Sequence, residues 1–90
     1  MRYFAAIQSI RDLEKIEAAK SQHVEFLERM AASGKIALRG RFTDGSGGLT
    51  IFRAESLEEA RRLAEDDPYV RVGARHLELH EWDMKPRVDG

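Results

Sequence analysis

The sequence contains no cysteine and only two prolines among its 90 residues. Without cysteine, the chain offers no disulfide, no thiolate metal ligand and no cysteine nucleophile. Neither sign of charge is in excess, because the chain has 15 Lys and Arg and 16 Asp and Glu, which give a net charge of −1 at pH 7. This balance argues against a protein that binds nucleic acid or an anionic membrane surface through charge alone.

Long apolar runs are also absent. No stretch approaches the roughly 20 apolar residues that cross a bilayer, and the opening MRYFAAIQSIRD lacks the apolar core of a secretory signal. We therefore expect a cytoplasmic protein. The 42% hydrophobic content predicts a folded chain, and its length predicts one domain over residues 1–90. A chain this short buries only about 60–65% of its unfolded surface, so a partner is expected to cover more.

Residue patterns predict four strands and two helices in the order βαββαβ. The first helix is expected to begin between Asp12 and Glu17 and to end at Gly34, because glycine is favoured directly after the C-terminus of a helix. The second begins at a capping box, Ser56–Glu59, and is expected to end near Asp67 because proline follows. The predicted strands cover residues 2–8, 35–42, 48–54 and 75–84, with an irregular turn over 68–73 and a loose tail over 85–90.

This element order favours an α+β fold, a ferredoxin-like sandwich with an antiparallel sheet in the order 4-1-3-2. The compositions of the strands agree: the first and third are apolar on both faces, whereas the second and fourth alternate. Strands buried on both faces belong at the centre of a sheet. Two helices cover only one sheet face, so the apolar second face would be open to water. We therefore expect a homodimer packed sheet to sheet.

Two polar residues break the helical patterns. His23 lies in the middle of the apolar stripe of the first helix, which holds Ile16, Ala19, Phe26, Leu27 and Met30. Asp67 lies about 20° from Ala60 on the inner face of the second helix, at the negative end of its macrodipole, where it needs a compensating donor.

Both helices pack on one sheet face, so we predict a hydrogen bond between His23 and Asp67 near one end of the sheet. The carboxylate would fix the imidazole tautomer and leave the other ring nitrogen for a substrate. The alternative is a structural ion pair that closes a small core.

Other candidate residues have two readings. Arg39 and Arg41 are expected on the same side of the second strand, opposite Ile36 and Leu38, where they either bind an anionic ligand or solvate an edge strand. Tyr69 either lines a pocket and offers its hydroxyl or fills a gap.

Metal and cofactor signals are weak. His76 and His80 would lie about 13 Å apart on a strand, too far to share an ion. The glycine-rich segment 45–48 precedes a strand rather than the helix that a phosphate-binding loop needs. We expect neither a metal nor a cofactor.

Several motifs together resemble the YciI-like, or YCII-related, family of small dimeric α/β-barrel proteins. The resemblance covers about residues 2–83. It rests on His23, the segment Gly34–Gly40, a glycine-rich hairpin, Ser56–Ala60, the run Asp66–Val70 and Gly73.

The resemblance implies a ferredoxin-like protomer, a homodimer, and a pocket at the dimer seam. The family's histidine matches His23 and its aspartate before proline matches Asp67, and we expect Gly40, Arg41 and Tyr69 to bind substrate there. Two departures, Lys20 in place of arginine and Arg41 in place of proline, change the shape and charge of the pocket entrance.

Some relatives are connected with elimination or isomerisation of small ring compounds. The resemblance therefore implies a cofactor-independent enzyme of lyase or isomerase type, in which the His23 imidazole moves a proton and Asp67 orients that imidazole. The alternative is a dimeric module that binds a ligand in the same pocket, or regulates through it, without turnover.

Overall fold

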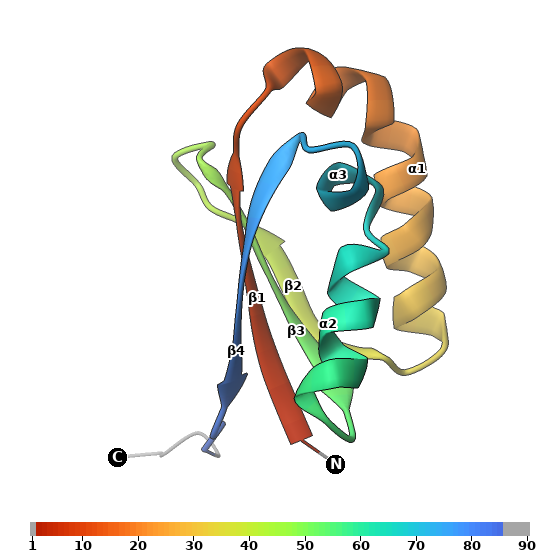
Figure 1. The fold of residues 1–90 in the computed structure, drawn as a ribbon, viewed down its shortest axis with the longest axis vertical. Coiled ribbons are helices and arrows are strands. Elements are labelled where there is room, and N and C mark those ends of the chain that lie inside the picture. Colours follow the sequence, from red (N-terminus) through yellow and green to blue (C-terminus); the bar gives the residue numbers. More distant parts are fainter. Residues whose placement is uncertain (1, 86–90) are drawn as a thin grey trace.

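The computed structural model describes residues 2–85, which form a four-stranded sheet and three helices (Figure 1). The predicted tail falls almost wholly outside the described residues. The elements follow the chain in the order β1 (Arg2–Ile10), α1 (Leu13–Ala32), β2 (Ile36–Arg41), β3 (Gly47–Ala54), α2 (Leu57–Glu65), α3 (Pro68–Arg71) and β4 (Arg75–Trp82).

The sheet has the strand order β2-β3-β1-β4, and each neighbouring pair is antiparallel. The predicted order 4-1-3-2 is confirmed, with the two apolar strands at the centre. All three helices lie on one side of the sheet, and α3 sits beside α1 (Figure 1). The predicted α+β class is confirmed as well. In the described part of the chain, no helix is long and apolar enough to cross a membrane.

Side-chain caps set the starts of the two long helices. Asp12 accepts a hydrogen bond from the Lys15 N–H at the start of α1. Ser56 accepts from the Glu59 N–H at the start of α2, and the Glu59 carboxylate accepts from the Glu55 N–H. These bonds satisfy backbone donors that have no partner inside a helix. The Ser56 half of the predicted capping box is present, whereas Glu59 accepts from the N–H one residue before the N-cap.

The prediction that Asp67 faces the negative end of a helix macrodipole is wrong. Helix α2 ends at Glu65, and Asp67 has an extended backbone with φ −60° and ψ 124°. The ring of Pro68 disfavours helical geometry at the preceding residue, so the chain turns there and starts α3 in place of the predicted irregular turn. Asp67 is the N-cap of α3, where the helix dipole favours a carboxylate.

The prediction that Ile36 and Leu38 share one face of β2 is also wrong. The register of β2 against β3 shifts between these two residues, so Ile36 is buried whereas Leu38 is 61% exposed. One extra residue in a strand turns the following side chains to the other face. Arg39, opposite Thr50, and Arg41, opposite Gly48, therefore lie on the helix-covered face with Ile36.

The core lies between the sheet and the helices. The largest fully buried side chains are Phe4, Phe26, Phe52 and, unexpectedly for a charged residue, Asp67. On the opposite sheet face, strand pairing aligns a row of apolar residues that no helix covers, namely Ala5, Ile7, Leu49, Ile51 and Leu38.

Candidate functional site

The structure brings His23 and Asp67 together. The His23 Nδ1 atom, on α1, lies 2.7 Å from Asp67 Oδ1, and the side chains are 12% and 2% exposed. An ionised carboxylate can only accept hydrogen bonds, so Nδ1 carries the hydrogen in this pair. The Nε2 atom is then the ring nitrogen left for a ligand, and it bonds to none of the described residues.

Two further donors hold the Asp67 carboxylate. The Tyr69 backbone N–H donates to Oδ1 at 3.0 Å, and the Gln8 side-chain amide donates to Oδ2 at 3.0 Å. Burying a carboxylate is costly unless several donors replace the water that it loses. With these bonds and His23, both oxygens are occupied and the carboxylate has one defined orientation.

Sequence reasoning missed Gln8. It is 3% exposed on the helix-facing side of β1. Its amide oxygen accepts from Arg75 Nη1 at 3.2 Å while its nitrogen donates to Asp67, which fixes the orientation of the amide. The available signal was a polar residue in a strand that is otherwise apolar on both faces. The result is a chain of hydrogen bonds that runs Arg75–Gln8–Asp67–His23, buried at its centre and partly buried at both ends.

Tyr69 contacts both ends of this chain. Its ring stacks on the His23 ring, with centroids 3.9 Å apart and planes 16° from parallel, and the Arg75 guanidinium lies 4.6 Å from the Tyr69 ring centroid. Burial raises the pKa of the Tyr69 phenol, the charges of Asp67 and Glu17 raise it further, and Arg75 opposes them. Tyr69 is therefore a neutral phenol at physiological pH, and its ring limits the rotation of His23.

Arg75 is the second polar residue that sequence reasoning missed. Burial lowers the pKa of its guanidinium, and the negative charge of Asp67 partly opposes this shift. An arginine still remains charged at neutral pH. Its Nε atom is buried and has no hydrogen-bond partner among residues 2–85.

His23 lines a cavity of about 790 Å³ between α1 and one end of the sheet. This volume falls within the range of small-molecule sites. The predicted substrate-binding residues Gly40, Arg41 and Tyr69 all line the cavity, whereas Asp67 lies behind His23. The wall further includes Ile16, Glu17, Lys20, Val24, Leu27, Arg39, Leu49, Thr50 and Arg75, and glycines of the β2–β3 hairpin.

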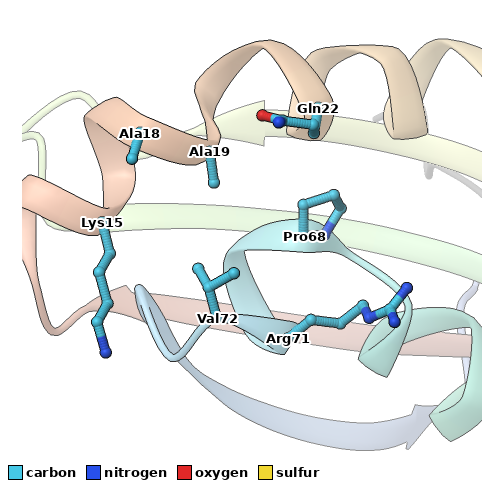
Figure 2. Close-up of a pocket in the computed structure, with 7 residues that line it drawn as sticks. All are labelled: Lys15, Ala18, Ala19, Gln22, Pro68, Arg71 and Val72. Atoms are coloured by element: carbon cyan, nitrogen blue, oxygen red, sulfur yellow. The ribbon is translucent and has the colours of Figure 1, made fainter.

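A second depression, of about 580 Å³, lies between α1 and α3 (Figure 2). Ala18 and Ala19 on one side face Pro68 and Val72 on the other, and Lys15, Gln22 and Arg71 complete its lining. None of these side chains is an imidazole or a carboxylate. The depression therefore lacks a group suited to proton transfer near neutral pH, and we place the candidate chemistry in the His23 cavity.

Metal ligands are not gathered in the described part of the chain. Within residues 2–85, no three His, Asp or Glu side chains lie close enough together to hold one ion. His76 and His80 are exposed on β4, on the sheet face that the helices leave open.

The fold and this site define a small α+β protein with a histidine–aspartate pair beside a cavity. The chain belongs to the YCII-related domain family, whose model matches residues 1–83, which confirms the family resemblance. It is 40% identical over 63 residues to YjpA, an uncharacterized protein of Bacillus subtilis strain 168, and the alignment covers 70% of this chain and 74% of YjpA.

Among solved structures, the chain is similar to 5-chloro-2-hydroxyhydroquinone dehydrochlorinase from Burkholderia phenoliruptrix AC1100 in complex with 2,5-dihydroxybenzoquinone. The match has a TM-score of 0.77 and covers 92% of this chain and 95% of the other. The sequences are 23% identical, so this likeness establishes the common fold.

Proposed function

We propose that this protein is a cytoplasmic, cofactor-independent enzyme of lyase or isomerase type, in which His23 moves a proton on a small cyclic substrate. One observation carries the proposal. The Nδ1 atom of His23 is held at 2.7 Å by a buried carboxylate, while the same side chain lines a cavity of ligand size. This is the arrangement by which a carboxylate orients an imidazole as a general base.

In the proposed reaction, His23 Nε2 takes a proton from an acidic C–H or O–H of the substrate. The imidazolium that forms is stabilised by Asp67, which accepts from Nδ1–H throughout. His23 then returns the proton to another atom of the substrate in an isomerisation. In an elimination, the electron pair of the broken C–H or O–H bond is pushed into a new π bond, the leaving group departs with the electron pair of its own bond to carbon, and the proton later passes from His23 to solvent.

The name of the structural neighbour supports an elimination on a hydroxylated ring. That protein is a dehydrochlorinase of 5-chloro-2-hydroxyhydroquinone. A dehydrochlorination removes a proton and a chloride, which requires a base and no cofactor in principle. We therefore choose chlorinated and hydroxylated rings as first substrates to test on this chain.

The test measures chloride release from 5-chloro-2-hydroxyhydroquinone and related chlorinated hydroquinones, together with solvent deuterium uptake by non-chlorinated rings. We expect turnover by the wild type and a loss of about 10²–10⁴-fold in kcat for His23→Ala. Arg61→Gln, an exposed substitution outside the cavity lining, is the matched control. Equal turnover by wild type and His23→Ala would remove His23 from the chemistry. Saturable binding without turnover would favour the alternative of a binding or regulatory module.

We further propose that a second copy of the chain covers the open sheet face. The row of apolar residues on that face has no covering helix; its central residue Ile51 is only 2% exposed, but Leu38 and Trp82 at the two edges are 61% and 43% exposed. Large apolar side chains exposed on a sheet face are typical of an interface. Light scattering should give the mass of a dimer for the wild type and of a monomer for Leu38→Glu. A wild-type monomer at micromolar concentration would contradict the dimer.

A further inference from the structure

The His23 cavity gathers positive charge that no ion pair neutralises among residues 2–85. Lys20 of α1, Arg39 and Arg41 of β2, and Arg75 of β4 all line it, against the single lining carboxylate of Glu17. None of the four cations forms an ion pair with another residue of the described range 2–85. Four positive groups and one negative group leave the wall with a net charge of 4 − 1 = +3, and the site stays positive at 4 − 2 = +2 when Asp67 behind His23 is included, although the whole chain carries −1.

The irregularity in β2 creates this arrangement. Without the register shift between Ile36 and Leu38, regular alternation from Ile36 would have put Arg39 and Arg41 on the open sheet face. With the shift, Arg39 lies opposite Thr50 and Arg41 opposite Gly48, on the face that carries the cavity. Solvation of an edge strand would not require both arginines to face the same hollow as His23.

Unpaired cations around one hollow repel one another, and a bound anion relieves that repulsion. Arginine also matches planar oxyanions in shape, because its guanidinium offers parallel N–H donors to two oxygens at once. Arg75 contributes its charge to the cavity wall, while its Nη1 atom donates to Gln8. Its Nε donor is buried and not open to the cavity, so we assign the direct contacts with a bound anion to Arg39 and Arg41.

We propose that the cavity binds a small planar organic oxyanion, with its negative oxygens on Arg39 and Arg41 and its reacting atom toward His23. The proposed anion site does not depend on the proposed function, whereas the placement of the reacting atom beside His23 does. Both a carboxylate and a deprotonated ring hydroxyl have this chemistry.

The test compares three probes by two-dimensional NMR titration of the full chain. Benzoate carries a carboxylate, 2,5-dihydroxybenzoquinone carries ionised ring oxygens, and benzamide is the uncharged match of benzoate. We expect at least one oxyanion to shift the resonances of the cavity residues with an affinity at least about tenfold above that of benzamide. Raising the salt from about 0.05 M to about 0.5 M should weaken oxyanion binding and leave benzamide unchanged.

Variants assign the binding to particular cations. The double substitution Arg39→Gln with Arg41→Gln should weaken oxyanion binding at least about tenfold, whereas Arg61→Gln should not change it. Arg39 and Arg41 are exposed, so their substitution leaves the core intact. The salt series on the wild type is a second measurement that needs no variant. Equal affinity for benzoate and benzamide, no binding of either oxyanion, or unchanged affinity in the double variant would each overturn the proposal.

His23→Ala separates this proposal from the proposed function. It should abolish turnover while the oxyanion still binds in an arginine-dependent way. Arginine-dependent binding without turnover of any ring compound by the wild type would remove the catalytic proposal and keep the anion site. Turnover that depends on His23 but prefers uncharged substrates would do the reverse.

Discussion

The two ends of the helix-covered core are built on opposite principles. At the end where β1 begins, Phe4, Ala54 and Ala60 form an apolar cluster with Leu63 and Leu79. At the other end, the same strand carries Gln8, and the buried side chains include a carboxylate and an amide, which a partly buried guanidinium joins. Both ends belong to one sheet and one helical layer (Figure 1), so the difference lies in the side chains and not in the architecture.

The comparison teaches where stability and chemistry reside in a small domain. An apolar cluster gains stability in proportion to the area that it buries and tolerates changes that keep volume. A buried polar chain is stable only while every donor faces an acceptor, because one unpaired member costs more than a hydrogen bond contributes. Apolar packing would fill the second end at lower risk to stability, and the function that we propose for His23 would account for the polar chain there.

The largest expected effect is on the apolar end. Phe4→Ala should lower the free energy of unfolding by about 3–5 kcal/mol, because Phe4 is fully buried and its removal leaves a cavity. Urea unfolding measures the loss, and oxyanion binding per folded molecule should not change. A loss below about 1 kcal/mol would mean that this end contributes little to the core.

The second largest effect is expected at the polar end, when the Asp67 carboxylate is replaced. Asp67→Asn keeps the shape but replaces an acceptor by a donor. The new NH₂ group must then face either the Gln8 amide nitrogen or the donors of His23 and Tyr69. We expect a loss of about 2–3 kcal/mol in the free energy of unfolding and a large loss of turnover. An unchanged free energy of unfolding in urea would contradict this prediction, because it would mean that the mismatched donor costs nothing.

A compensating exchange at the same end should recover part of that loss. Adding Gln8→Glu to Asp67→Asn restores an acceptor opposite the new amide and gives Arg75 a carboxylate partner. We expect the pair of substitutions to regain about 1–2 kcal/mol relative to the sum of the single changes in a double-mutant cycle. Turnover should stay low, because the carboxylate no longer touches His23. Recovery of turnover together with stability would mean that the carboxylate need not lie beside the His23 imidazole.

The smallest expected effect concerns an exposed ion pair at the apolar end. Arg2 donates two hydrogen bonds of 2.7 Å to Glu81, and these bonds, with the charge of Arg2, lower the pKa of the Glu81 carboxyl. A carboxyl whose folded pKa lies below its unfolded value adds stability above the unfolded pKa. That stability is lost as the pH falls through the folded pKa.

Arg2→Gln should therefore lower the thermal midpoint slightly at neutral pH and not at all in strong acid. Thermal unfolding at several acidic pH values measures this difference. Arg61→Gln, which breaks a longer pair of 3.9 Å, is the matched control. A difference between wild type and Arg2→Gln that grows as the pH falls would contradict the assigned sign.

Much of the site was predictable because it follows from local patterns. The helical angle places His23 on an inner stripe, and Pro68 marks a break beside an inward carboxylate. Gln8 and Arg75 were not found, since their roles depend on partners 59 and 67 residues away in the sequence. Arg39 and Arg41 lie together and opposite Leu38 as predicted, but on the same face as Ile36 and not opposite it, because no glycine or proline marks the register shift that precedes them.

The sequence by itself determined the order of the elements, the central position of the two apolar strands and the inward direction of His23. These follow from the period of each element and from caps, which act over a few residues. Only the tertiary structure decided which partners hold Asp67 and which arginines face the cavity. Those contacts join β1, β2, β4, α1 and α3, and a shift of one residue in the pairing of strands moves a side chain to the opposite face of the sheet.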